Sequence, residues 1–92
     1  MNPCLAIIDP NTLSNIALRS VLWDVYNNVE VYTYGDMDSF IRDSTRHFVH
    51  FFVSSDIFFT HVDEFELLRN QTTVLCIGPN KRYENAGFIV LD

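Results

Sequence analysis

The stretch from Phe48 to Asp56 reads F-V-H-F-F-V-S-S-D, and it decides the fold. Its first part is almost continuously apolar, is rich in aromatic and β-branched side chains, and has the length of one strand. A strand that is apolar on both faces is typical of the middle of a parallel sheet, because helices cover such a sheet on both sides. The run stops at Ser54 and Ser55, and ligand sites of open α/β sheets lie where the central strands end. We therefore expect Phe48–Val53 to be the central strand and the polar residues after it to lie at the candidate site.

Four more apolar runs of strand length lie along the chain. They are residues 4–8, 29–34, 73–77 and 88–91. The run 29–34 alternates in polarity, as the edge strand of a sheet does. Helical or turn-like segments separate the runs, and such alternation predicts a parallel sheet with right-handed crossovers and helices on both faces. The chain is therefore predicted to be one α/β domain.

The predicted helices are marked by caps and by apolar spacing. The first helix should begin at Asn11 or Thr12 and end at Asn27-Asn28, because asparagine tolerates the left-handed conformation. Its predicted inward stripe consists of Leu13, Ile16, Ala17, Val21, Leu22 and Val25. A short second helix should start at Asp36 or Asp38 and turn Met37, Phe40 and Ile41 inward. A third helical segment is expected to start near Thr60, with Asp63 and Glu64 in its first turn.

Composition limits the classes of function. The chain has 92 residues, 48% of them hydrophobic, and twelve acidic against six basic residues, for a formal charge of −6. Nucleic-acid binding needs a concentrated basic surface, so the chain by itself is not expected to bind DNA. No apolar run is long enough to span a membrane and no secretory leader is present, so we expect a cytoplasmic protein. Cys4 and Cys76 lie in strand-like runs and are expected to be free, and no metal-binding spacing or cofactor motif occurs.

With these elements, the chain resembles a response-regulator receiver domain of two-component signal transduction over its whole length. The segment 5–11 (L-A-I-I-D-P-N) resembles the receiver opening, and Val29–Val31 followed by Gly35-Asp36 resembles the second strand and its exit. The segment 86–92 (A-G-F-I-V-L-D) is similar to the fifth strand of receivers attached to LuxR/NarL-type helix-turn-helix domains, and the Phe-rich central strand to receiver-like regulators of Bacteroides-type bacteria. The resemblance implies a flavodoxin-like (CheY-like) doubly wound sheet of five parallel strands in the order 2-1-3-4-5. The fourth helix would be short or missing, and the final helix would be absent.

The resemblance also implies which residues occupy the phosphorylation-site positions, and there the chain departs from the family. Working receivers hold Mg²⁺ with an acidic pair, which is reduced here to Asp9 followed by Pro10. The phosphate-accepting aspartate corresponds to Ser54, the Thr or Ser of the fourth strand to Gly78, and the lysine of the fifth strand to Leu91. One carboxylate gives Mg²⁺ few oxygen ligands, and loss of the lysine leaves phosphoryl charge without a cation. The resemblance therefore implies a degenerate, non-phosphorylatable regulator that is not an enzyme.

Two alternatives stay open at this site. Asp56, two residues beyond Ser54, is an alternative phosphate acceptor beside Asp9, or else it caps the following helix. The vacated pocket around Asp9, Ser54, Ser55 and Gly78 could instead bind a small molecule, which would make the chain a sensor.

Three nearby side chains, those of His50, Phe58 and Phe59, have expected positions of their own. His50 lies in the apolar central strand and is expected to be hydrogen-bonded to a neighbour. Phe58 and Phe59 are expected to pack beneath the third helix. One of the two could alternatively fill the space that phosphate and metal would occupy.

The expected oligomeric state follows from the missing final helix. Without it, the first helix covers only about half of one sheet face, which leaves apolar side chains open. We expect the chain to be the N-terminal piece of a longer regulator and this surface to be closed by self-association. DNA would then be bound only through a C-terminal domain outside this chain.

Overall fold

The computed structural model describes residues 2–43, 47–75 and 89–91, with side chains described up to residue 75. Parallel strands β1 (Cys4–Ile8), β2 (Glu30–Tyr34), β3 (Phe48–Ser54) and β4 (Thr72–Leu75) form a sheet in the order β2-β1-β3-β4. A three-residue strand, β5 (Ile89–Leu91), pairs with β4 in parallel. The prediction that the aromatic run is the central strand is confirmed, because β3 lies between β1 and β4. Within the described ranges, no helix combines the length and apolar character needed to cross a membrane.

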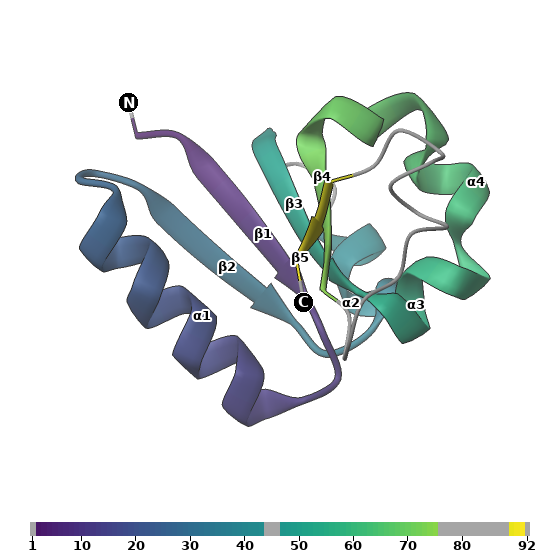
Figure 1. Cartoon of the computed structure of the whole chain (residues 1–92), viewed down its shortest axis with the longest axis horizontal. Helices are drawn as coiled ribbons and strands as arrows, with labels where there is room; N and C mark the ends of the chain where they lie inside the picture. Colours follow the sequence, from purple (N-terminus) through teal and green to yellow (C-terminus); the bar gives the residue numbers. More distant parts are fainter. Residues whose placement is uncertain (1, 44–46, 76–88, 92) are drawn as a thin grey trace.

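The helices lie on both sides of the sheet. Helix α1 (Thr12–Val25) packs on one side, and α2 (Met37–Arg42), α3 (Ser55–Thr60) and α4 (Val62–Phe65) pack on the other (Figure 1). A 3₁₀ helix, η1 (Glu66–Gln71), connects α4 to β4. The sequence therefore folds as the predicted α/β architecture with a parallel sheet.

A bulge in β3 decides which face each aromatic side chain takes. The pairing with β1 shifts so that Cys4 is opposite Phe48 while Leu5 is opposite His50, which leaves Val49 as the extra residue. An extra residue reverses the side-chain alternation on one side of it. As a result Phe48 lies on the same face as Phe51, in the larger core cluster beneath α2, α3 and α4. His50 turns to the α1 face.

The two faces carry cores of unequal size. The larger cluster holds ten buried residues, which are Ala6, Ile8, Tyr34, Met37, Phe48, Phe51, Val53, Phe58, Phe65 and Val74. On the α1 face, the buried hydrophobic cluster of the described residues consists of Leu5, Ile7 and Leu22, with Leu18, Val29, Val31 and Phe52 packed partly against them. Burial of apolar surface drives folding. In the described residues, the sheet face beneath α2, α3 and α4 therefore contributes most of the core.

The predicted inward stripe of α1 is wrong in most positions. Leu22 is buried as expected, but Leu13 is 76% exposed and Val25 is 64% exposed. The buried polar residue of this helix is Asn15, which is not part of the predicted stripe. The cap was predicted correctly, because the Asn11 side chain accepts a hydrogen bond from the backbone N–H of Ser14 at 3.0 Å. Asn28, just past the helix, has the expected positive φ of 64°.

The second and third predicted helices agree with the structure in part. Helix α2 begins at the Asp36 cap and buries Met37, whereas Ile41 is 54% exposed and not inward. The hydrogen bond from the Ser39 backbone N–H to Asp36, 2.7 Å long, holds the pKa of that carboxyl below its ordinary value. The segment expected to start near Thr60 corresponds to α4, which begins at Val62 and has Asp63 and Glu64 in its first turn, as predicted. The sequence pattern missed α3, which starts immediately after β3 and has Thr60 as its last residue.

Phe58 and Phe59 have separate environments. Phe58 is fully buried and lies 5.9 Å from the ring of Phe65, centroid to centroid, so it is a core residue. Phe59 is 62% exposed, so the expectation that both rings pack inward holds only for Phe58.

Candidate functional site

Asp9 and Ser54 lie side by side at the carboxyl edge of the sheet. The parallel register pairs Ile8 of β1 with Val53 of β3, so the residues that follow them, Asp9 and Ser54, lie at the same level of the sheet. Asp9 is 8% exposed and Ser54 is 9% exposed. The fold therefore brings these two positions together at one edge of the sheet. Both are polar groups at the rim of an apolar core.

Ser54 serves as the link between strand and helix. It is the last residue of β3 and the N-cap of α3, with extended backbone angles (φ −62°, ψ 149°). Its hydroxyl oxygen accepts a long hydrogen bond from the Ile57 backbone N–H at 3.4 Å. A serine at this position satisfies one of the open N–H groups at the helix start. The local sequence S-S-D therefore starts a helix directly after the strand.

The Asp9 carboxylate is held by the chain that follows it. Its Oδ1 accepts a hydrogen bond from the Asn11 backbone N–H at 2.9 Å. Its backbone carbonyl accepts one from the Asn15 side-chain amide at 2.8 Å. These bonds fix the turn between β1 and α1, and they account for the inward position of Asn15.

Asn15 is a residue of this region that sequence reasoning missed. Its Oδ1 is buried and has no hydrogen-bond partner within the described part of the chain. A polar residue in the middle of an amphipathic helix is ordinarily assigned to the solvent side. The signal that could have identified it is its spacing, since Asn15 lies one helical turn after Asn11, beside the acidic end of β1.

The predicted site residues Pro10 and Asp56 are exposed, unlike Asp9 and Ser54. Pro10 is exposed in the turn after Asp9. Asp56 is exposed in the first turn of α3, where a negative charge complements the helix dipole. The cap of this helix is Ser54 and not Asp56, which corrects the capping interpretation. In the described residues, no three His, Cys, Asp or Glu side chains gather closely enough to hold a metal ion.

The sheet register places Leu91, one of the two remaining predicted site positions. Ser54 pairs with Leu75, and Leu75 pairs with Leu91, so these three residues form one row across β3, β4 and β5. Leu91 thus shares a row with Ser54. Gly78 lies outside the described residues.

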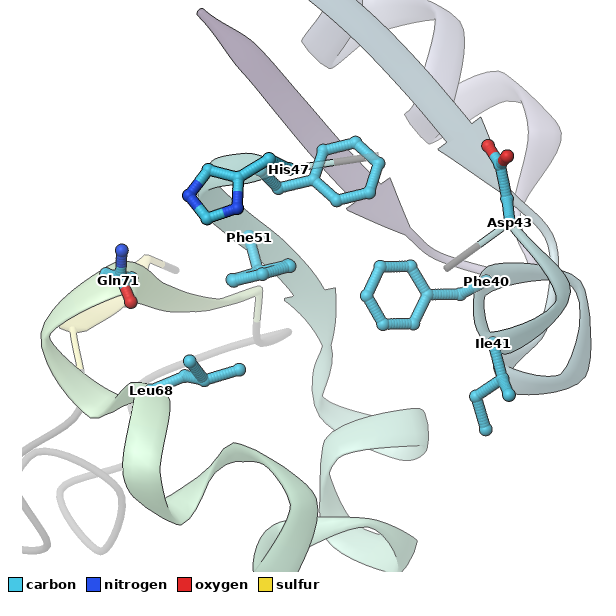
Figure 2. Close-up of a pocket in the computed structure, with 8 residues that line it drawn as sticks. Phe40, Ile41, Asp43, His47, Phe51, Leu68 and Gln71 are labelled. Carbon is cyan, nitrogen blue, oxygen red and sulfur yellow. The ribbon is translucent and has the colours of Figure 1, made fainter. Parts of the chain in front are cut away.

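Among the described residues, two of the hollows lie away from this edge. The first has a volume of about 370 Å³ and is formed by α2, the start of β3 and η1 (Figure 2). Phe40 and Leu68 point toward each other across it, and Phe51 forms part of its floor. Asp43, which also lines it, accepts a hydrogen bond from the Tyr34 hydroxyl at 2.5 Å. The hollow is therefore apolar with a few polar groups, which is the common composition of ligand pockets.

The second hollow is a groove of about 500 Å³ on the α1 face, lined by residues including Tyr26, Val49, His50, Phe52 and Thr73. The His50 imidazole Nε2 lies 2.7 Å from the Thr73 hydroxyl, which confirms the expected hydrogen bond to a neighbour. Its ring lies 4.9 Å from the ring of Phe52, centroid to centroid. Partial burial lowers the pKa of His50 below its ordinary value, so the ring stays neutral at pH 7.

Comparison with known proteins provides no relative for this chain. No protein-family model, no curated protein and no solved structure matches it.

Proposed function

We propose that this chain is a receiver-like regulatory domain that has lost phosphoryl transfer and acts by dimerisation or by docking to a partner. The proposal is supported by the sheet order β2-β1-β3-β4, which is compatible with a flavodoxin-like fold. It is also supported by the element order along the chain and by the helices on both faces.

One observation carries the proposal. At the carboxyl end of the central strand, the residue beside Asp9 is Ser54, whose hydroxyl oxygen accepts the hydrogen bond that starts α3. A hydroxyl cannot form the acyl phosphate that an aspartate forms, and here the hydroxyl caps α3. The neighbouring Asp9 offers one carboxylate, with one oxygen already accepting the Asn11 N–H. Mg²⁺ prefers near-ideal octahedral oxygen coordination, which such a site supplies poorly.

Intact-mass measurement after incubation with a small phosphodonor and Mg²⁺ tests the proposal. We expect the mass of the chain to stay unchanged. Addition of one phosphoryl group would overturn the proposal. The variants Asp56→Asn and Asp63→Asn would then identify the acceptor, because both aspartates are exposed in the first turn of a short helix. Phosphorylation lost only in the first variant would establish Asp56 as the acceptor.

A small-molecule sensor is the second candidate, favoured by the hollow in Figure 2 and not by the Asp9–Ser54 edge. Its volume of about 370 Å³ is within the usual range of ligand pockets. Small molecules are first screened by thermal shift on the wild-type chain. Each stabilising compound is then measured on the variant Leu68→Trp, in which the larger side chain fills the hollow. The matched control is Leu67→Trp, because Leu67 is 94% exposed and does not line the hollow. A true ligand should lose its stabilising effect only in the Leu68 variant.

A further inference from the structure

The hollow between α2, β3 and η1 has an aromatic wall, formed by Phe40, Phe48 and Phe51 (Figure 2). The centroids of these three rings lie 5.7 Å or 5.8 Å from one another, so the rings form one continuous surface. Phe48 and Phe51 are each only 7% exposed and belong to the larger core cluster, which holds the wall in place. Such a wall accepts an apolar ligand, and the faces of its rings attract a cation.

A carboxylate is fixed beside the aromatic wall. Asp43, the C-cap residue of α2, lines the hollow, and its Oδ2 accepts the hydrogen bond from the Tyr34 hydroxyl. Tyr34 is itself buried, and its ring lies 5.5 Å from that of Phe40 and 6.2 Å from that of Phe48, centroid to centroid. A side chain of the core therefore holds the carboxylate against the aromatic wall. A carboxylate held in this way is a preorganised partner for a positive charge.

The residues around the hollow favour a cationic ligand. Among the described residues that line it, Asp43 provides the one carboxylate, and neither lysine nor arginine is present. Arg42 is next to Asp43 in the chain, but it is exposed and does not line the hollow. His47 and Gln71 lie at the exposed rim, where they can form hydrogen bonds with a ligand. The formal charge of −6 on the whole chain also attracts cations and repels anions.

The hydration of Asp43 distinguishes between the possible ligands. A molecule that fills the hollow displaces water from the carboxylate that lines it. Loss of water around a charged group is costly unless an opposite charge takes its place. A neutral apolar ligand leaves this cost uncompensated, and an anion adds repulsion. An ammonium group compensates it and also interacts with the aromatic wall. This attraction depends on the charge of Asp43, whichever of its lone pairs already accept hydrogen bonds.

We propose that this hollow binds a small organic ammonium ion, with the positive group beside Asp43 and the apolar body against the aromatic wall. The volume of about 370 Å³ is within the range of small-molecule sites. The inference rests on the second candidate function, the small-molecule sensor, and adds the chemical class of the ligand.

Three probes that share one phenylethyl body test the inference. They are phenethylamine, which is positively charged at pH 7, phenethyl alcohol, which is neutral, and hydrocinnamate, which is negatively charged. Each probe is titrated at pH 7 into the isotope-labelled complete chain, and backbone NMR signals report both the dissociation constant and the residues affected. The amine should bind at least about tenfold more tightly than the alcohol, and hydrocinnamate should bind most weakly. The affected signals should include those of Phe40 and Leu68, which face each other across the hollow.

Two matched variants test the part of Asp43. Asp43→Asn removes the charge and keeps an oxygen that can accept the Tyr34 hydroxyl, so the amine should bind about tenfold more weakly while the alcohol binds as before. The control is Asp38→Asn, which removes the same charge from an exposed aspartate in the first turn of α2 that does not line the hollow. This control should leave both dissociation constants unchanged. The NMR spectra show whether each variant is folded, and the three probes on the wild-type chain decide the ligand class even if Asp43→Asn does not fold.

The outcomes separate this inference from the functions on which it depends. Equal binding of amine and alcohol, or an amine affinity that Asp43→Asn leaves unchanged, overturns the ammonium class. The sensor function would still stand in that case if Leu68→Trp abolished the binding. Signal changes confined to other parts of the chain, or no binding of any probe, also overturn the inference, and the thermal-shift screen then judges the sensor function by itself. The phosphodonor experiment judges the proposed regulatory function in every case.

Discussion

The pair Phe58 and Phe59 provides a sharp test of the described core. The two residues are adjacent in α3 and chemically identical, but Phe58 is fully buried while Phe59 is 62% exposed. We expect Phe58→Leu to destabilise the fold and Phe59→Leu to have little effect. Leucine is used because truncation of a buried phenylalanine to alanine costs about 3–5 kcal/mol, a large part of the stability of a small domain.

The magnitude follows from burial. Phe58 packs in the larger core cluster against Phe65, so a leucine there loses ring contacts and leaves part of the ring volume empty. We expect a loss of about 1.5 kcal/mol in the free energy of unfolding, whereas Phe59→Leu should change it by less than about 0.5 kcal/mol. With a urea m-value of about 1.5 kcal/mol/M, the buried substitution lowers the unfolding midpoint by about 1 M.

Urea unfolding should be followed by far-UV circular dichroism. Tryptophan fluorescence is less suitable because Trp23, the single tryptophan, is 52% exposed on α1 and far from this core. Equal midpoint shifts in the two variants would refute the described orientation of α3. A shift in only the Phe59 variant would mean that the helix is rotated.

Two further predictions concern single polar side chains, and both use the urea midpoint. Because burial lowers the pKa of His50 below 6.5, the folded chain takes up a proton less readily than the unfolded chain, so stability should fall as the pH drops from about 6.5 through the folded-state value. His50→Gln keeps a hydrogen-bonding group for Thr73 but cannot titrate, so its midpoint should fall less between pH 7 and pH 5, and parallel pH curves would contradict this account. Ser54→Ala should cost about 1 kcal/mol through loss of the α3 cap, while the control Ser55→Ala, inside the helix, should cost less than about 0.5 kcal/mol. Equal effects of the two serine substitutions would argue against the cap.

The local elements and their order could be read from the sequence. The strand Cys4–Ile8 was predicted with its observed bounds, and the aromatic run was correctly placed in the middle of the sheet. Asn11 and Asp36 were each one of two predicted caps, because a short polar side chain before an apolar segment satisfies open helix N–H groups nearby in the chain. These features depend on residues close together in sequence, so one sequence suffices to find them. The juxtaposition of Asp9 and Ser54 followed from the expected parallel sheet.

The orientation of each element was decided only by tertiary contacts. Helix α1 is apolar around much of its circumference, so periodicity alone could not tell which side faces the sheet. The hydrogen bond from the Asn15 amide to the Asp9 carbonyl turns Asn15 and Leu22 inward, and it leaves Leu13 and Val25 outside. Likewise, the extra residue Val49 in β3 follows from register with β1, and it places Phe48 on the same face as Phe51, while His50 lies with Phe52 on the other face. Both choices depend on partners distant in the chain, which local sequence patterns do not record.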